Sequence, residues 1–343
     1  CIAMKEMNRR DFVKMTGAAA VGLALSQIPR GGAAFSQAPI IGSTYVPKAD
    51  EKGSSAKVYF TKNIDAEHLI KLYDTINEGI YGKIGIKLHT GEPNGPNILP
   101  RPMVKSFQAH VPNSTIVETN TLYQGKRYTT EDHKKTLETN GWTFCPVDIL
   151  DEEGDISLPV RGGKHLKEVA MGSHLTNYDS LIVLTHFKGH AMGGFGGSLK
   201  NIAIGCASGQ VGKRQVHGVM DQMPADFKQW PMQDYFMELM VDSGKATVDY
   251  FGKHIVFINV MRRMSVDCDC AGVSAAEPTI GDIGIVASTD ILAVDQASID
   301  MVYQRKDNRD LVERIESRHG LHQLAAMRDL KMGNEKYQLI SID

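Results

Sequence analysis

The sequence predicts an α/β protein built on a largely parallel mixed sheet with helices on both faces. From Lys57 onward, short runs rich in β-branched residues alternate with segments of helical periodicity, and no repeat of fixed length is apparent. No proline-rich or serine-rich linker divides this part of the chain. Residues 57–343 are therefore expected to form a single α/β domain, either as one body or as two lobes that meet near residues 175–180.

Strands and helices are expected in alternation. We predict strands at Lys57–Thr61, Lys83–Leu88, Thr115–Glu118, Phe144–Leu150, Ser180–Thr185, His254–Val260 and Asp282–Val286. We predict helices at Ala66–Tyr81, Arg101–His110, Thr130–Thr139, His165–Met171, Ser198–Ala207, Met232–Phe251, Asp290–Gln304 and Arg309–Met327. Strands that alternate with helices are joined by crossovers, so most of them should run parallel.

Composition excludes several classes of protein. Among the 343 residues, 42% are hydrophobic and 23% are charged, which is typical of a globular domain and not of a disordered chain. The 38 Lys and Arg residues are offset by 40 Asp and Glu, so no overall positive field exists to bind nucleic acid. Five cysteines are too few for a disulfide scaffold but enough for a small metal or redox site.

The first residues have the pattern of an export signal. Arg9 and Arg10 are followed by Phe12 and Lys14, and then by an apolar run rich in Ala and Gly that extends to Leu25. Paired arginines in this setting resemble the twin-arginine signal, whose route carries proteins across a membrane already folded. The twin-arginine translocase is therefore an expected partner.

This signal predicts where the mature protein is found. Residues 1–38 are expected to be removed as a signal peptide, which leaves residues 39–56 as an extended N-terminus of an exported protein, periplasmic or extracellular. The apolar run is shorter than the roughly 20 residues that a spanning helix needs, so no stable membrane span is expected. A buried amphipathic first helix is the alternative, but the run has no polar face at the helical period.

Polar side chains cluster just after several predicted strands. In parallel sheets ligands bind at the carboxyl ends of the strands, so these side chains are candidates for a site. They are His89 and Glu92, Asn120, the group His186, Lys188 and His190, the run Asp267 to Cys270, and the run Ser288 to Asp290.

Cys268 and Cys270 are the leading candidates for metal ligands. In an extended segment, residues two apart project to the same face, so both thiols can hold one metal ion or share an edge of an iron-sulfur cluster. Asp267 and Asp269 would face the other way and are candidates for ligand contact. A local disulfide and a pair of free buried thiols are the alternatives. The candidates for further metal ligands are Cys206, His186 and His190.

A glycine-dense turn follows the strand predicted at Ser180–Thr185. Five glycines in nine residues let the backbone approach a ligand closely, and the helix that starts after them offers unpaired N–H groups to an anion. The alternative is a flexible connector. The candidate ligand-binding residues of this stretch are Gly193, Gly194, Gly196, Gly197, Ser198, Lys200 and Asn201.

Three lysines outside this stretch are candidate counter-charges for an anionic ligand. They are Lys87, Lys188 and Lys213. Lys213 belongs to a small basic cluster with Arg214 and His217, for which an ordinary solvated face is the alternative. Cys206 lies in an apolar stretch, and a core thiol is the simpler interpretation.

The sequence lacks the motifs of common hydrolases. It has no Gly-x-Ser-x-Gly elbow, no His-Glu-x-x-His motif, no CxxC and no P-loop. The sequence therefore gives no support for a serine hydrolase of the Gly-x-Ser-x-Gly type, a zinc peptidase of the His-Glu-x-x-His type or a P-loop nucleotide hydrolase.

In combination, four segments resemble the family called domain of unknown function 362. They are Lys83 to Glu92, Gly193 to Ile202, Gly205 to Ser208 and Asp267 to Cys270. The resemblance continues through Asp282 to Ser288 and Ala293 to Ser298, and so covers nearly all of the mature chain. It implies the core fold of that family and a site, but it names no reaction.

The chain departs from many members of this family at one place. Those members carry a ferredoxin-like insert with CxxCxxC motifs and are described as iron-sulfur proteins. Between Gln215 and Met232, where the insert would fall, this chain has no cysteine. The resemblance thus implies the family core without its electron-carrying accessory.

Two functions are expected from these observations. The first is an exported protein that binds a metal ion or iron-sulfur centre through Cys268 and Cys270 and serves a redox or metal-dependent reaction on a small molecule. The second is a non-catalytic protein that binds a small anionic ligand at the glycine-dense turn. Transport in the folded state favours the first, because a cofactor acquired in the cytoplasm has to cross the membrane inside a folded protein.

Overall fold

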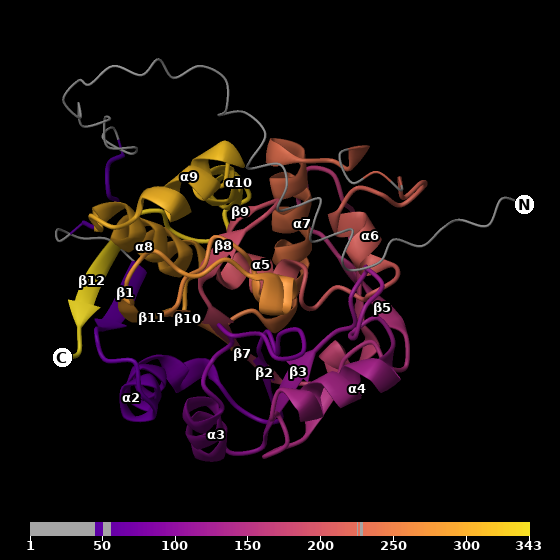
Figure 1. Ribbon diagram of the computed structural model, residues 1–343, viewed down its shortest axis with the longest axis horizontal. Coiled ribbons are helices and arrows are strands. Elements are labelled where there is room, and N and C mark those ends of the chain that lie inside the picture. Colours follow the sequence, from indigo (N-terminus) through magenta and orange to yellow (C-terminus); the bar gives the residue numbers. More distant parts are fainter. Residues whose placement is uncertain (1–44, 51–55, 225, 227–228) are drawn as a thin grey trace, which may run out of the picture.

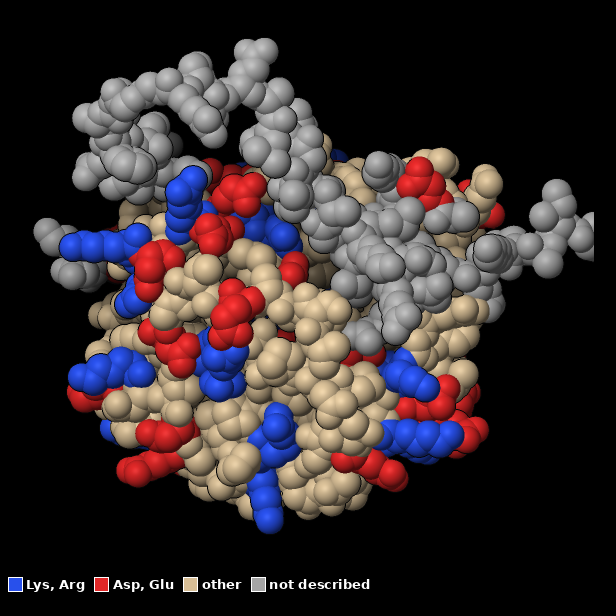
Figure 2. All heavy atoms as spheres, in the orientation of Figure 1, with Lys and Arg blue, Asp and Glu red and all other residues tan. Residues whose placement is uncertain are grey.

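A computed structural model describes residues 45–50, 56–224, 226 and 229–343. The predicted signal peptide, residues 1–38, lies outside the described residues, as does most of the predicted extended segment 39–56. Within the described part, no helix is both long and apolar enough to cross a lipid bilayer. Basic and acidic side chains alternate over the face shown in Figure 2, without a large patch of one sign.

The core of the fold is an eight-stranded mixed sheet. Its strand order is β12-β1-β11-β10-β7-β2-β3-β4, and five of its seven neighbouring pairs are parallel. The strands are β1 (Ala56–Thr61), β2 (Ile84–Lys87), β3 (Ser114–Glu118), β4 (Val147–Ile149), β7 (Ser180–His186), β10 (Ile255–Met261), β11 (Gly284–Ser288) and β12 (Tyr337–Ser341). The predicted α/β class and the largely parallel sheet are confirmed.

Helices cover both faces of this sheet (Figure 1). In β7, Leu181 and Val183 pack into the core on one face, and Ile182 and Leu184 pack on the other, as the alternation of strand side chains requires. The first face is covered by α5 (Ser198–Ala203), α7 (Gln233–Phe251), α8 (Ile291–Gln304), α9 (Arg309–Ser317) and α10 (His322–Asp329). The second is covered by α2 (Ala66–Ile76), α3 (Arg101–His110) and α4 (Thr130–Thr139).

The structure corrects the predicted helix at His165–Met171. This segment contains the strand β6 (Glu168–Gly172), which pairs antiparallel with β5 (Asp155–Pro159) in a separate two-stranded sheet. Val169 and Met171 are fully buried in the core below α6 (Gly212–Val216) and α7, so tertiary burial overrides the helical pattern of the segment.

Two further differences lie near the C-terminus. The helix predicted at Arg309–Met327 is divided into α9 and α10 by a turn that contains Gly320 and His319, the latter with a φ of 56°. β12 was not predicted, because its residues are mostly exposed and only Tyr337 is buried. It pairs parallel with β1 at the edge of the sheet.

β11 runs antiparallel to both of its neighbours. Its carboxyl end therefore leaves the sheet at the edge opposite to the carboxyl ends of β2, β3, β7 and β10. Ser288 to Asp290, which the sequence grouped with the other polar residues after strands, consequently lie away from the candidate site. Asp290 instead caps α8 by accepting a hydrogen bond from the N–H of Ala293 at 2.9 Å.

A buried carboxylate fixes the short helix α5. The N–H groups of Ser198 and Leu199 donate to the two carboxylate oxygens of Asp295 at 2.7 and 2.9 Å, and Asn259 Nδ2 donates to the same carboxylate at 2.8 Å. Gly197 precedes the helix, where a Cβ atom would lie only 2.4 Å from Asp295 Oδ1. The helix start that the sequence offered to an anionic ligand is therefore filled by the protein itself.

Replacing Asp295 with alanine should destabilise the fold more than removing an ordinary helix cap. Asp295→Ala leaves three buried donors without their acceptor, so we expect the free energy of unfolding to fall by about 3 kcal/mol. Asp65→Ala, which removes the exposed cap of α2, should cost about 1 kcal/mol. Urea denaturation of both variants checks the comparison, and an equal or smaller loss for Asp295→Ala would contradict it.

Candidate metal centre

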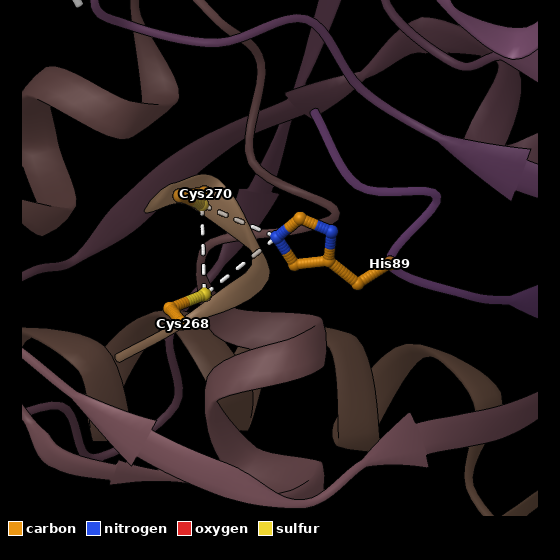
Figure 3. A group of neighbouring side chains, drawn as sticks. All are labelled: His89, Cys268 and Cys270. Atoms are coloured by element: carbon orange, nitrogen blue, oxygen red, sulfur yellow. Dashed lines mark hydrogen bonds between the residues drawn. The ribbon is translucent and has the colours of Figure 1, made fainter. Parts of the chain in front are cut away.

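Three side chains meet at the carboxyl edge of the parallel strands (Figure 3). Nε2 of His89 lies 3.2 Å from Sγ of Cys270 and 3.7 Å from Sγ of Cys268, and the two sulfur atoms are 3.5 Å apart. Among the described residues, this is the group of His, Cys, Asp or Glu side chains whose ligand atoms lie close enough to share one ion. The structure thus brings the two expected cysteines together with a histidine that the sequence assigned to ligand contact.

Chain topology explains why these residues meet. His89 follows β2 by two residues, and Cys268 and Cys270 lie in the loop after β10, where Cys268 precedes the short 3-10 helix η4 (Asp269–Ser274). β2 and β10 both run parallel to β7, so their carboxyl ends reach the same edge of the sheet. This is the edge at which parallel sheets bind ligands.

The loop that carries His89 is held by hydrogen bonds from Asn140 and Trp142. Nδ2 of Asn140 lies 3.0 to 3.2 Å from the carbonyl oxygens of Thr90, Gly91 and Glu92. Trp142 Nε1 donates to the carbonyl of Thr90 at 2.8 Å. The backbone beside His89 is therefore fixed before any ligand arrives.

The hydrogen bonds of His89 define which ring nitrogen carries the proton. The N–H of Gly91 donates to Nδ1 at 3.0 Å, so the proton of the neutral ring lies on Nε2, which faces Cys270. Burial lowers the pKa of His89 and keeps the ring neutral, although the charge of Cys270 opposes this effect. A metal ion bound at Nε2 would take the place of this proton, and the Gly91 N–H would then stabilise the negative charge on the ring.

Two cationic side chains contact the sulfur atoms. Lys200 Nζ lies 3.3 Å from Cys268 Sγ, and Arg127 Nη2 lies 3.7 Å from Cys270 Sγ. The hydrogen bond with Cys270, together with the charge of Lys200, holds the pKa of Cys268 well below its usual range although burial opposes ionisation. Burial also disfavours the ammonium of Lys200, but the charges of Cys268 and Cys270 outweigh it and raise the pKa of Lys200 to about 12. Cys268 is thereby prepared to act as a thiolate donor, whereas the hydrogen bond with Cys268 and burial raise the pKa of Cys270.

Buried carboxylates balance Arg127 and one more cation, Lys87. Arg127 Nε donates to Glu92 at 3.0 Å, and Lys87 Nζ donates to Glu118 at 2.8 Å. Burial alone would raise the pKa of Glu118, but the charge of Lys87 holds it well below its usual range. Lys87 also donates to Asn201 Oδ1 and to the carbonyl of Leu88, both at 3.1 Å, so its three N–H groups all have acceptors within the protein.

Asp269 accepts hydrogen bonds from His186 and Lys188. Lys188 Nζ and His186 Nδ1 both lie 2.9 Å from Asp269 Oδ2, and His186 Nε2 lies 2.8 Å from the carbonyl oxygen of Arg262. The charges of His186 and Lys188 hold the pKa of Asp269 well below its usual range, against the effect of burial. Both ring nitrogens of His186 thus lie against oxygen atoms of the protein, and His186 does not join the group of His89, Cys268 and Cys270.

The other two candidate metal ligands lie outside the group. Cys206 is fully buried in the core below the sheet, and burial raises its pKa to about 12. His190 lies in the hairpin formed by β8 (Lys188–His190) and β9 (Gly194–Gly196), where its Nδ1 accepts a hydrogen bond from the N–H of Gly193 at 2.9 Å. Cys206 packs as a core thiol, and His190 closes the hairpin turn.

The glycine-dense turn is an ordered hairpin packed against the C-terminal helices. Gln323 of α10 donates to the carbonyl oxygens of Gly193 and Phe195 at 2.6 and 3.1 Å. Gly194 has a φ of 76°, and a Cβ atom there would lie 2.8 Å from Cα of Gly320. Glycine at position 194 is therefore required by the backbone and by close packing, independently of a ligand.

Lys213 and Asn120 are buried and bonded within the protein. Lys213 Nζ donates to Thr119 Oγ1 at 2.6 Å and to the carbonyl of Ala207 at 2.7 Å, and burial lowers its pKa to about 8. Asn120 Nδ2 donates to Thr130 Oγ1 at 2.9 Å. Lys213 thus lies in the interior, and the solvated face that was the alternative from the sequence is wrong for this residue.

His217 and Asp267 also have partners that explain them. Nδ1 of His217 donates to the carbonyl of Lys213 at 2.6 Å, and the ring centroid lies 5.6 Å from that of Trp230. Burial lowers the pKa of His217 to about 4. Asp267 pairs with Arg314 of α9 at 3.1 Å.

Sequence reasoning missed two residues that contact the site. Arg127 lies between β3 and α4 with no motif around it, yet it reaches Glu92, Tyr123 and Cys270. Glu118 was assigned to a strand and not to the site. Its position as the last residue of β3, at the carboxyl edge, is the signal that identifies it.

The spacing of the three donor atoms fits a single tetrahedral ion. With metal–sulfur bonds of about 2.3 Å and metal–nitrogen bonds of about 2.0 Å, neighbouring sulfurs lie roughly 3.7 Å apart and sulfur and nitrogen roughly 3.5 Å apart. The distances among His89, Cys268 and Cys270 are 3.2, 3.5 and 3.7 Å. Two thiolates and an imidazole suit zinc and the softer transition metals, and they leave one position of the tetrahedron to another ligand.

The fold and this site define an α/β protein with a buried thiolate and imidazole group at the carboxyl edge of a parallel sheet. The chain belongs to the family described as domain of unknown function (DUF362), whose sequence pattern matches residues 84–300. This family assignment confirms the resemblance seen in the sequence. A search of curated proteins finds no match.

Two solved structures are similar to this chain at low sequence identity. The lactate racemase apoprotein from Thermoanaerobacterium thermosaccharolyticum is 12% identical, with a TM-score of 0.43 over 75% of this chain and 58% of that protein. A structural-genomics protein from Thermotoga maritima is 10% identical, with a TM-score of 0.39 over 71% of this chain and 60% of that protein. The chain thus spans about three fifths of the length of each.

The buried ring of His217 should make stability depend on pH. Its pKa is about 4 in the folded protein and 6.5 in the unfolded chain, so the unfolded state binds more protons between these values and stability falls as the pH falls. We expect the parent to lose about 3 kcal/mol relative to His217→Phe between pH 7 and pH 4. Urea denaturation across this range measures the difference, and parallel curves for the two proteins would refute the assignment.

Proposed function

We propose that this chain is an exported metalloprotein in which Cys268, Cys270 and His89 bind one metal ion for a redox or metal-dependent reaction on a small molecule. The single observation that carries the proposal is the convergence of these three donor atoms, at spacings that suit a tetrahedral ion, on the ligand-binding edge of the sheet. When bound, such an ion supplies a Lewis acid or a redox centre.

A single ion is better supported than an iron-sulfur cluster. Clusters are usually held by four cysteine thiolates, or by two cysteines and two histidines. In the described part of the chain, Cys206 and Cys145 do not join the group around Cys268 and Cys270, and His89 is its one histidine. These donors suffice for one ion that has an open position.

The protein's own residues prepare this centre in three ways. Lys200 stabilises Cys268 as a thiolate, and Arg127 places a cationic group beside Cys270. Asn140 fixes the loop that carries His89. Burial removes water that would compete for the ion, because Cys268 is only 6% exposed.

A purely anion-binding role has less support. Of its three proposed counter-charges, Lys87 and Lys188 pair with Glu118 and Asp269. The start of α5 is occupied by Asp295. The charges that were assigned to a ligand are therefore largely balanced within the protein.

Loss of the two thiols should abolish metal binding. In protein purified without an affinity tag or chelator, we expect close to one metal ion per chain in the parent and in Cys145→Ser, and almost none in the Cys268→Ser, Cys270→Ser double variant. Elemental analysis measures the content. Added metal at a hundred times its dissociation constant should stabilise the parent by about 2.7 kcal/mol and leave the double variant unchanged. A metal-free parent that no metal stabilises would contradict the proposal.

Export is proposed to follow the twin-arginine route. Replacing Arg9 and Arg10 with lysine keeps the charge, but the arginine pair is recognised by a receptor, so the precursor should accumulate in the cytoplasm. Fractionation and immunoblotting of the two forms measure processing. Equal export and processing of the double-lysine precursor would show that the route is a different one.

A further inference from the structure

Two buried lysines flank a glycine beside the proposed centre. Lys188 and Gly196 are paired across the β8–β9 hairpin, so their side-chain positions share one face. A Cβ atom at Gly196 would lie 3.5 Å from Cδ of Lys200 and 4.0 Å from Cε of Lys188. The stems of both lysines therefore pass the same glycine, and Lys200 continues from there to Cys268.

These two ammonium groups have fewer acceptors than donors. An ammonium has three N–H groups. Within the part of the chain that the structure describes, Lys200 contacts Cys268 Sγ and Lys188 contacts Asp269 Oδ2. Lys87, which contacts Asn201 next to Lys200 in the chain, has three acceptors. Lys188 and Lys200 are 3% and 6% exposed, so they obtain little compensation from bulk water.

The charge balance of the centre also calls for an anion. Five lysine and arginine side chains are buried around it: Lys87, Lys188, Lys200, Lys213 and Arg127. Three carboxylates are buried with them, those of Glu92, Glu118 and Asp269. With a divalent ion bound, both thiols are ionised and the Nε2 proton of His89 is displaced. One positive charge is then left in excess, which is costly in a buried site.

The hairpin supplies one more neutral donor. Nδ1 of His190 accepts from Gly193, so its proton lies on Nε2. Burial lowers the pKa of His190 well below its usual range, and the charge of Lys200 acts in the same direction. His190 thus adds an N–H group to the hairpin without adding a charge.

We infer that the open position of the metal ion and the ammonium groups of Lys188 and Lys200 together form a site for a small oxyanion. One oxygen of the anion would ligate the ion, and a second oxygen would accept hydrogen bonds from the two lysines across Gly196. This inference rests on the proposed metal centre and names the class of substrate that the centre takes. Carboxylates and phosphates share the required chemistry, because both carry two oxygens on one atom.

Cobalt(II) provides a direct test, because its visible spectrum reports thiolate ligation and a change in the fourth ligand separately. The parent protein loaded with cobalt(II) is titrated with sodium acetate and, in a second arm, with sodium phosphate at constant ionic strength. We expect one of them or both to change the ligand-field bands saturably. The arm that saturates shows whether the site takes a carboxylate or a phosphate.

Two variants locate the anion at the lysines. Gly196→Ala places a methyl group between the stems of Lys188 and Lys200 at ordinary contact distances, so it should fold and weaken anion binding by about tenfold. Lys188→Met should weaken it by at least as much. Lys245→Met is the matched control, because Lys245 also pairs with one carboxylate, that of Asp249, but lies on α7, and its anion binding should equal that of the parent.

The outcomes separate this inference from the metal proposal. Thiolate-to-cobalt bands that neither anion perturbs would overturn the oxyanion site and leave the metal centre intact. Anion binding that Gly196→Ala and Lys188→Met do not weaken would overturn the role of the lysines. If the parent shows no thiolate-to-cobalt bands, both the metal centre and the oxyanion site are wrong.

Discussion

Balanced charge in the interior is the constraint on which this structure depends. Glu92, Glu118 and Asp269 are almost inaccessible to solvent, and each contacts a buried cationic side chain. A buried charge that loses its partner is strongly destabilising, so these side chains fix the loops that follow β2, β3, β7 and β10 relative to one another. These buried ion pairs both charge the carboxyl edge of the sheet and hold its loops in place.

The short helix α5 joins this charged layer to the core. Its first turn is held by Asp295 of α8, and the next two residues, Lys200 and Asn201, reach Cys268 and Lys87. Asn201 also donates to the carbonyl oxygens of Lys87 and Leu184, and so ties the helix to β2 and β7. The buried carboxylate of Asp295 therefore positions Lys200, which contacts the thiol of Cys268.

The sequence predicted those features that follow from local periodicity. The parallel strands and most of their helices could be placed, and the rule that ligands bind at the carboxyl ends of strands indicates His89, Lys188 and Cys268. Cys268 and Cys270 could be paired because their spacing is local. β6 was mistaken for a helix because burial against α7 decides its conformation, and this contact is not local.

The remaining site residues depend on contacts between distant segments. Arg127 reaches Glu92 and Cys270 across 35 and 143 residues of sequence, and no local pattern marks it. Likewise, the start of α5 looked open to an anion because its cap, Asp295, lies 97 residues away. Such partners can be identified only when the order and direction of the strands are known, and the reversed direction of β11 shows how one antiparallel strand moves a polar cluster to the other edge.

X-ray absorption spectroscopy at the edge of the bound metal tests the central claim most directly. The account predicts two sulfur scatterers at about 2.3 Å, one nitrogen at about 2.0 Å with the outer-shell pattern of imidazole, and one further light atom. The imidazole pattern should disappear in His89→Ala while both sulfurs remain. A first shell made only of oxygen and nitrogen, or one with four sulfurs, would contradict a centre built from Cys268, Cys270 and His89.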